Sequence, residues 1–262
     1  GVWRAILAGT GAVVAIAFGL FLESPTPNFA AWAGAAAMVG LLLLVSGWAT
    51  ASHPSLAPER DLAAHGLFTS IAQYWLREKA TKPPIRTTLP VLQRTPSALP
   101  DIVVIQSESF FDARRLFQGI KKDVLHHYDE ACAAAALHGR LSVPAWGANT
   151  MRPEFAFLTG LAPDSLGIHR FNPYRCVTRR PLNALPAVLR EAGYRTTCIH
   201  PHPARFFRRD RAFPNLGFDR FVDLREFRGA QKAGPYISDA AVTDKLLLEL
   251  EAAKEPSFLF VI

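Results

Sequence analysis

The 262-residue sequence contains only three cysteines and two methionines. Cys132, Cys176 and Cys198 lack metal-ligand spacing and can form at most one disulfide, so they do not indicate a redox compartment. Their simplest interpretation is that they are small buried hydrophobic side chains. The sequence also lacks a zinc-finger pattern, an RNP-like aromatic motif and internal repeats, which argues against a nucleic-acid-binding module.

Negative charge is the scarcer sign, with 22 Asp and Glu residues against 29 Lys and Arg residues and a formal net charge of +7. A basic surface favours an anionic partner, such as a lipid headgroup or a polyphosphate. Because no nucleic-acid signature accompanies this charge, we expect no nucleic acid among the partners.

Charge is missing altogether from two long apolar runs, residues 5–22 and residues 29–48. Each is long enough to cross a hydrocarbon core of about 30 Å as a helix. A signal peptide is a poor alternative for the first run, because the second follows closely and no small-residue cleavage site is evident. Buried helices of a soluble protein are the other alternative, but the lengths favour two transmembrane helices within residues 1–50. The loop 23–28 holds no Lys or Arg, so the orientation stays open.

A proline-rich stretch, residues 51–98, predicts a juxtamembrane connector. Within it, residues 62–79 carry apolar side chains at helical spacing. Such an amphipathic helix either lies on the bilayer surface or packs on the following domain.

Strand and helix patterns alternate through residues 99–262, which indicates βαβ units and an α/β fold with a mostly parallel sheet flanked by helices. The expected strands are residues 101–107, 140–143, 195–200 and 258–262. The expected helices are residues 123–138, 151–160, 182–192 and 238–253. Because the last strand reaches the end of the sequence, we expect the protein to continue beyond residue 262.

The first candidate site residue is Glu108, which follows a strand rich in β-branched residues that begins after Pro100. Ligands of open α/β sheets bind at the carboxyl ends of the strands, so Glu108 is a possible metal ligand. A surface or capping glutamate is the alternative interpretation. Asp112, one loop further on, either shares a metal or caps the next segment.

The second candidate is Thr150, 42 residues later, which leads an apolar helical pattern. From the pattern alone, a helix cap that accepts backbone N–H groups is the simpler interpretation. As a nucleophile, Thr150 needs a metal or a base to lower the pKa of its hydroxyl. The helix N-terminus would then favour a tetrahedral anion in front of it.

The third candidate is a cluster at residues 199–211, at the end of the strand 195–200. His200 and His202 occupy the ligand edge of the sheet, and Phe206 and Phe207 can form an apolar wall. The arginines, which suit the forked recognition of phosphate, are Arg205, Arg208, Arg209 and Arg211. A solvated basic loop facing acidic lipids is the alternative interpretation.

Together, these three places resemble the sulfatase-like branch of the alkaline phosphatase superfamily, and look most like membrane-anchored phosphoglycerol transferases of the lipoteichoic acid synthase type. The resemblance covers about residues 100–262. The matching pieces are Ser107-Glu108-Ser109-Phe110, Thr150 with Glu154-Phe155, Leu158-Thr159-Gly160-Leu161, His200, Phe206-Phe207-Arg208-Arg209-Asp210 and Leu216-Gly217-Phe218-Asp219.

The resemblance implies a metal site and a nucleophile. Glu108 would be a ligand of a divalent metal, Mn²⁺ in the first place with Mg²⁺ or Zn²⁺ as alternatives. Thr150 would be both a ligand of that metal and the catalytic nucleophile. Such enzymes complete the metal site with an Asp-His pair just after a strand matching 258–262. The segment in hand is therefore expected to bind metal poorly and to be inactive alone.

The resemblance also implies substrate contacts for His200, Phe206 and Arg209, which match positions that contact the glycerophosphate group. His202 is a further candidate for substrate binding. It occupies a position at which the family has a short polar residue.

The expected function is transfer of a phosphoglycerol headgroup from a membrane phospholipid to a cell-envelope glycan or glycolipid, through a threonine intermediate. The expected location is the bacterial plasma membrane, with several spans and an extracytoplasmic catalytic domain. A phosphoethanolamine transferase, a phosphodiesterase and a sulfatase-like hydrolase are alternatives within the superfamily. Sulfate ester hydrolysis is disfavoured, because Thr150 cannot become formylglycine and the segment 176–180 lacks the proline of the sulfatase motif. A membrane-tethered binding domain is the non-enzymatic alternative.

Overall fold

The computed structural model describes residues 14, 18, 32–40, 54–82, 87, 89, 99–108, 110–144, 149–178 and 180–262. The chain forms two compact units, Gly1–Lys82 and Pro83–Ile262. The two expected membrane spans lie largely outside the described residues. Among the residues that are described, no helix is both long and apolar enough to cross a membrane.

The first unit contains two short helices where a single amphipathic helix was expected. Helix α3 (Pro58–His65) and helix α4 (Leu67–Ala80) are separated by Gly66, at φ 72° and ψ −179°. Glycine adopts this conformation without steric penalty, so the helical pattern breaks there. Asp61 is buried and accepts a hydrogen bond of 2.6 Å from the Tyr74 hydroxyl, which joins the two helices. The prediction of one continuous helix over residues 62–79 was therefore wrong.

The second unit contains a four-stranded parallel sheet in the order β1-β6-β2-β3. Its strands are β1 (Ile102–Ile105), β2 (Arg195–Ile199), β3 (Arg220–Val222) and β6 (Ser257–Val261). Helices connect the strands, as parallel pairing requires. The predicted α/β fold with a mostly parallel sheet is confirmed.

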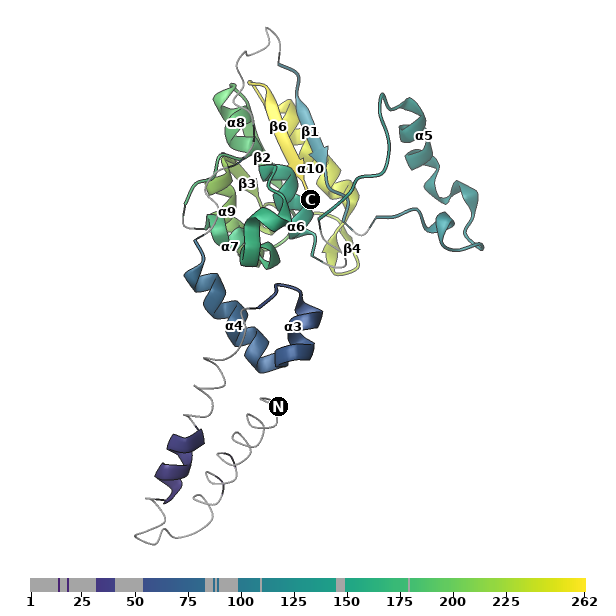
Figure 1. Cartoon of the computed structure of the whole chain (residues 1–262). Coiled ribbons are helices and arrows are strands. Elements are labelled where there is room, and N and C mark those ends of the chain that lie inside the picture. The colour runs from purple at the N-terminus through teal and green to yellow at the C-terminus, as the bar shows by residue number, and fades with distance from the viewer. Residues whose placement is uncertain are drawn as a thin grey trace. The chain divides into compact units, whose positions relative to one another are not determined.

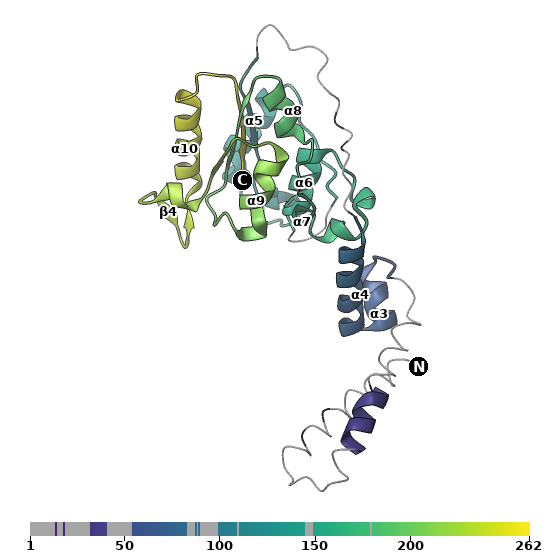
Figure 2. The ribbon, with the colours of Figure 1, turned by 90° about the vertical axis from the view of Figure 1, so that its left-hand side faces the viewer.

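Helices cover both faces of this sheet, with helix α10 on one face and a layer of shorter helices on the other (Figure 2). Helix α10 spans Asp239–Glu251. The opposite layer consists of α6 (Met151–Thr159), α7 (Tyr174–Val177), α8 (Leu185–Glu191) and α9 (Arg209–Leu216).

Strand β6 supplies both halves of the core, because successive side chains point to opposite faces. Phe258 and Phe260 pack in the cluster formed with the α6–α9 layer, whereas Leu259 and Val261 pack in the cluster that includes Leu246 of α10. Full burial of such side chains contributes about 1.5–3 kcal/mol each. The sheet is thereby held firmly on both faces, which fixes its carboxyl edge.

Two expected elements differ from the structure. The predicted helix 123–138 is a 3₁₀ turn, Lys122–Leu125, followed by the shorter helix α5 (His126–Ala134). Residues 140–143 form no strand.

The strand at 101–107 was expected to be buried, but β1 lies at the edge of the described sheet. There Val103 is 39% exposed and Ile105 is 65% exposed. Its β-branched composition suits a pleated surface but does not reveal whether one face or both are covered.

Several short elements were not expected from the sequence. Besides β3, α7 and α9, these are the antiparallel pair β4 (Lys232–Ala233) and β5 (Tyr236–Ile237), and the 3₁₀ turns Ala113–Arg115, Pro163–Phe171, Phe206–Arg208 and Leu224–Phe227.

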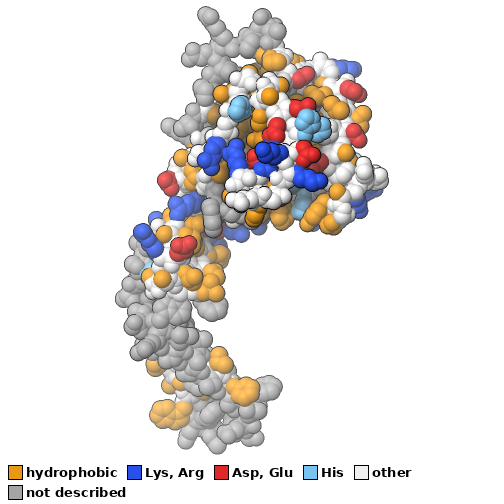
Figure 3. Space-filling model, turned by 90° about the vertical axis from the view of Figure 1, so that its right-hand side faces the viewer, with side chains coloured by type: hydrophobic (Ala, Val, Ile, Leu, Met, Phe, Trp, Pro, Cys, Tyr) orange, Lys and Arg blue, Asp and Glu red, His pale blue; other side chains and the backbone are white. Residues whose placement is uncertain are grey.

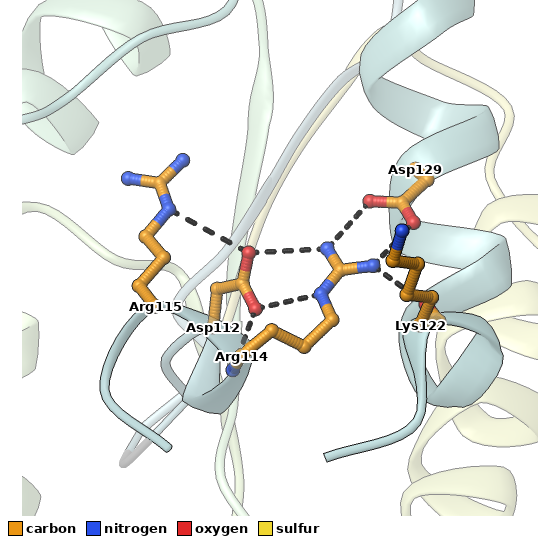
Figure 4. A network of polar contacts seen from close by, with 5 residues as sticks. All are labelled: Asp112, Arg114, Arg115, Lys122 and Asp129. Carbon is orange, nitrogen blue, oxygen red and sulfur yellow. Dashed lines mark hydrogen bonds and ion pairs between the residues drawn. The ribbon is translucent and has the colours of Figure 1, made fainter. Parts of the chain in front are cut away.

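Between β1 and α6 the chain makes a long excursion that carries α5 to the side of the sheet (Figure 1). Arg114 holds this excursion together by bridging Asp112 and Asp129 (Figure 4). Viewed from that side, acidic, basic and histidine side chains are mixed on the surface (Figure 3).

Candidate active site

The carboxyl ends of β1, β2 and β6 border a cavity of about 750 Å³. Its lining includes all six residues that the sequence singled out, namely Glu108, Thr150, His200, His202, Phe206 and Arg209. These residues come from segments up to 101 positions apart (209 − 108). The structure brings them together at the carboxyl edge of the sheet, and their roles stay predictions.

The two residues expected to share a metal both open onto this cavity. Glu108 is an exposed residue just after β1. The side-chain Nε2 of Gln106 lies 3.5 Å from Glu108 Oε1. Thr150 precedes helix α6, and its backbone carbonyl accepts a hydrogen bond of 3.1 Å from the Glu154 N–H. The Thr150 hydroxyl does not cap the helix. The capping interpretation was therefore wrong, because Thr150 already has helical backbone angles (φ −54°, ψ −28°) instead of the extended angles of a side-chain cap.

The N-terminus of α6 gives the Thr150 hydroxyl an electropositive setting. The first N–H groups of a helix have no intrahelical partner and carry partial positive charge. In the nine-residue helix α6 no side chain caps them. However, the Arg152 N–H donates to the Asn149 carbonyl at 2.9 Å, the Glu154 N–H donates to the Thr150 carbonyl, and Pro153 has no N–H. The helix dipole is therefore the main source of positive potential. An anion held in front of Thr150 would therefore be stabilised by the helix.

Arg209 is not the free anion clamp that the sequence predicted. Its side chain is 1% exposed and forms a bidentate salt bridge with the fully buried Glu154. Nε donates to Glu154 Oε1 at 3.1 Å, and Nη2 donates to Oε2 at 2.8 Å. This pairing could not be predicted from the sequence pattern, because the two residues lie 55 positions apart.

The hydroxyl of buried Tyr174 also donates a hydrogen bond to Glu154 Oε1. Burial, and then the charge of Glu154, hold the pKa of Tyr174 well above its usual value. Burial alone would lower the pKa of Arg209, but the attraction of Glu154 outweighs it and raises that pKa. Arg209 therefore stays charged, and its charge is paired with Glu154.

His200 lies between Arg209 and the end of β6. Arg209 Nη1 is 3.3 Å from His200 Nε2, and His200 Nδ1 is 3.3 Å from the carbonyl oxygen of Ile262. A guanidinium can only donate, so Nε2 must accept and Nδ1 must carry the proton. Burial, and then the charge of Arg209, lower the pKa of His200 to about 3. His200 is thus a neutral imidazole with a defined tautomer.

His202 and Phe206 form the aromatic wall of the cavity. The ring of His202 stacks on His200 with centroids 5.5 Å apart and contacts Phe206 at 4.5 Å. Within the described part of the chain, the buried Nδ1 of His202 has no hydrogen-bond partner. Buried polar atoms are nearly always paired, so a bound ligand or water would satisfy this nitrogen.

A left-handed turn separates the exposed and buried halves of this loop. Phe207 and Arg208 have φ of 52° and 58°, a conformation that costs about 1–2 kcal/mol per residue. The turn leaves Phe206 half exposed on the cavity and directs the next residue of the chain, Arg209, into the interior at the start of α9.

A model of the Sulfatase family matches residues 100–262, more than half of the chain. The chain belongs to the Sulfatase family. The described cavity thus lies within the sulfatase-family domain.

Two relatives come from Rhizobium meliloti (strain 1021). The chain is 38% identical over 165 residues to "Capsular polysaccharide biosynthesis protein RkpI", covering 62% of this chain and 30% of that protein. It is 29% identical over 163 residues to "Putative cyclic beta-1,2-glucan modification protein", covering 62% and 25%. The chain therefore spans less than a third of the length of either relative.

Solved structures with local similarity include the lipoteichoic acid synthase LtaP from Listeria monocytogenes, with 25% identity, a TM-score of 0.39 and coverage of 46% of this chain and 29% of that chain. A protein of the alkaline phosphatase superfamily from Vibrio parahaemolyticus has 23% identity, a TM-score of 0.36 and coverage of 43% and 28%.

The charges around the sulfatase-family cavity favour a cation. Two carboxylates, Glu108 and Asp239, line it, while the charge of Arg209 is already offset by Glu154. An anionic substrate would meet net negative charge there unless a cation bound first. Carboxylate and hydroxyl oxygens are ligands that suit Mn²⁺ and Mg²⁺. Glu108 and Thr150 thus form a donor set of two oxygens of the kind that a divalent metal binds.

Asp112 does not belong to this donor set, although the sequence offered a shared metal as one of its two roles. Its side chain caps the 3₁₀ turn Ala113–Arg115 by accepting from the Arg114 N–H, and forms ion pairs with both arginines of that turn. The hydrogen bond from Arg114 holds the pKa of Asp112 below its usual value. The capping interpretation is confirmed.

A further cluster has metal-ligand spacing. In the described part of the chain it is the sole group of three His, Cys, Asp or Glu residues close enough to share a metal ion. It consists of His126, His127 and Glu130, whose ligand atoms lie within 4.8 Å of one another on α5. All three are exposed and none lines the cavity.

The far wall of the cavity was not predicted. Tyr236 of β5 and Asp239 and Thr243 of α10 line it. A signal was available in the topology: a helix antiparallel to the strands begins at their carboxyl edge, so the start of the expected helix 238–253 had to lie beside the site.

Proposed function

We propose that this sulfatase-family chain is part of a membrane-bound, metal-dependent transferase. It would move a phosphoglycerol-type headgroup from a phospholipid to a cell-envelope glycan or glycolipid. The observation that carries the proposal is the Thr150 hydroxyl, which leaves α6 uncapped and lines one cavity with Glu108, His202 and Arg209. The names of both relatives refer to polysaccharide or glucan, which supports a glycan acceptor.

Glu108 and Thr150 would hold the divalent metal, with Mn²⁺ the first candidate and Mg²⁺ or Zn²⁺ the alternatives. When bound, the metal would lower the pKa of the Thr150 hydroxyl and polarise the phosphoryl group.

Thr150 would act as the nucleophile in the first half of the reaction. Its Oγ forms a bond to phosphorus, and the bond from phosphorus to the diacylglycerol oxygen breaks. Diacylglycerol leaves with the proton that Thr150 loses, and the phosphoglyceryl group stays on the threonine. In the second half, an acceptor hydroxyl attacks phosphorus, its proton passes to Thr150, and the enzyme is restored.

The surrounding residues would stabilise the charge that this exchange concentrates on phosphorus. The positive end of the α6 dipole faces developing negative charge without rearrangement, although the Arg152 and Glu154 N–H groups already donate to backbone carbonyls and Pro153 has no N–H. Two N–H groups of Arg209 have no partner among the described residues and can donate to a phosphoryl oxygen. His202 Nδ1 and Phe206 would contact the glycerol moiety.

We further propose that the enzyme is a multi-pass protein of the bacterial plasma membrane, with this cavity on the extracytoplasmic side. The apolar runs 5–22 and 29–48 would anchor it. Confining the enzyme and its lipid donor to one bilayer raises their effective concentration.

The test uses the complete protein, incubated with phosphatidylglycerol labelled in the glycerol headgroup and with Mn²⁺. Label should appear on the protein, and Thr150→Ala should abolish it while Thr178→Ala, which removes the hydroxyl of a half-buried residue outside the cavity, should not. Labelling that persists in Thr150→Ala would show that another residue is the nucleophile. Label that passes only to water would indicate a phosphodiesterase instead of a transferase.

A further inference from the structure

Five groups form one continuous chain of contacts behind the cavity. The Tyr174 hydroxyl donates to Glu154, Glu154 accepts two bonds from Arg209, Arg209 approaches His200, and His200 donates to the carbonyl of Ile262. Glu154 is the second group of this chain, between Tyr174 and Arg209; it is 0% exposed and does not line the cavity itself.

We propose that Glu154 is a positioning residue, which orients Arg209 and through it fixes the neutral tautomer of His200 on the cavity wall. This deepens the proposed function, on which it rests for the role of the cavity. Glu154 is one helical turn after Thr150 on α6, so a single helix would carry the nucleophile and set the geometry of the loop opposite.

The geometry leaves Arg209 little freedom. An arginine side chain has many rotamers, but a carboxylate that accepts from both Nε and Nη2 defines the plane of the guanidinium. In that plane Nη1 lies 3.3 Å from His200 Nε2. Without Glu154 the guanidinium could turn toward the cavity as a free cation, and His200 would lose the donor that keeps Nε2 unprotonated.

A purely structural role for the pair would not require this arrangement. Well-packed apolar residues can replace a buried ion pair with no loss of stability. What apolar residues could not do is present an N–H group to His200 and two further N–H groups beside the substrate. The direction of Nη1 toward a cavity residue therefore distinguishes positioning from simple packing.

The first experiment reads the tautomer directly and needs no substrate. In the complete protein with ¹⁵N-labelled histidine, long-range ¹H–¹⁵N spectra between pH 5 and pH 8 should show His200 with a protonated Nδ1 and an unprotonated Nε2. In Glu154→Gln, the two nitrogens should shift toward the average of both tautomers, whereas Glu154→Asp, which keeps the charge, should restore most of the wild-type pattern. The signals are assigned with His200→Gln.

A matched control is Glu249→Gln, which weakens an ion pair with Arg220 and Lys245 outside the cavity. It should leave the His200 signals unchanged. An unchanged tautomer in Glu154→Gln would overturn the proposal, and so would an equal change in Glu249→Gln. Neither outcome depends on whether phosphoglycerol is the transferred group.

The second experiment measures turnover of phosphatidylglycerol at matched folded fraction. Glu154→Gln should lower kcat/KM by about 10- to 100-fold, as is typical for loss of an outer-shell partner. In a double-mutant cycle, this loss should largely disappear in the His200→Gln background, because Glu154 then has no histidine to orient. Losses that simply add would show that Glu154 does not act through His200. Absence of turnover in the wild type would count against the proposed function, while the tautomer measurement would still decide the positioning role.

Discussion

Two arginines, Arg114 and Arg209, are both paired with carboxylates, yet they use their donors differently. Arg114 donates all five of its N–H groups, to both oxygens of Asp112, both oxygens of Asp129 and the carbonyl of Lys122 (Figure 4). Arg209 donates two to Glu154 and directs a third at His200. All N–H groups of Arg114 are thus used within the fold, whereas Arg209 keeps N–H groups that can donate to a ligand.

Burial separates the two regions further. Asp129 is 48% exposed and Arg114 is 21% exposed, so water can replace any bond that is lost. Arg209 and Glu154 are 1% and 0% exposed, so neither charge could be solvated without its partner. We infer that the Arg114 network organises the excursion around α5, whereas the Arg209 pair sets the chemistry of the cavity.

The largest expected effect comes from breaking the buried pair on one side only. Arg209→Met leaves Glu154 charged and unpaired in the interior, which should destabilise the protein by about 3–5 kcal/mol. Denaturant unfolding followed by circular dichroism measures this. The double variant Arg209→Met/Glu154→Leu should recover much of the stability but no labelling from phosphatidylglycerol. A single variant as stable as the wild type would mean that Glu154 takes up a proton at little cost.

Acid should affect the buried region first. The pKa of His200 is about 3 in the folded chain and near 6.5 when unfolded, so the unfolded state binds more protons between these values. Stability should therefore fall as the pH drops below about 6.5, by about 2 kcal/mol between pH 7 and pH 5. The measurement is urea unfolding at each pH, and His200→Gln should lose this part of the pH dependence.

In the same pH range the Arg114 network should be unaffected. The hydrogen bond from Arg114 lowers the pKa of Asp112 and of Asp129, so both stay ionised until the pH falls below their usual 3.8. The readout is the turn Ala113–Arg115, because α5 also carries His126 and His127 beside Glu130. Amide exchange in that turn that accelerated between pH 7 and pH 5 beyond its intrinsic pH dependence would contradict the separation of the two regions.

The sequence was enough to predict that three candidate residues lie near one another, because each position depends only on its own strand or helix. Glu108 and His200 follow strands, and Thr150 precedes a helix, so the rule that parallel strands end at one edge was enough to group them. That rule was not enough for Arg209, which was expected, from its residue type and from the family resemblance, to be free to bind an anion. Its partner, Glu154, lies 55 positions away on another element, and only the folded core brings the two together.

The fold was predictable to a similar extent. Strands β2 and β6 and helix α10 between them were predicted from their sequence patterns, whereas the edge position of β1 depends on which strands pair, and no property of residues 102–105 encodes that. The break at Gly66 was readable in principle, since a glycine between two helical turns permits φ above zero.

A moderate effect is expected from removing the saturated arginine. Arg114→Ala leaves Asp112 and Asp129 without their shared partner, but both carboxylates can turn to water, so the global stability should change little. Hydrogen exchange should accelerate in α5 and in the turn Ala113–Arg115, and stay unchanged in α6 and α9. Arg115→Ala, which removes only a 3.6 Å contact with Asp112, is the matched control and should have a smaller effect. Accelerated exchange in α6 would show that the excursion supports the active site.

Added salt should have the smallest effect of all, and that effect should be confined to the Arg114 network. At 1 M ionic strength the Debye length is about 3 Å, so attractions between exposed charges are largely screened, while buried pairs keep most of theirs. Exchange protection in α5 should therefore decrease modestly between 0.1 M and 1 M NaCl, and the His200 tautomer signals should not move. A tautomer that responds to salt as α5 does would mean that solvent ions reach Arg209, and the pair with Glu154 would then be no more secluded than the one with Asp129.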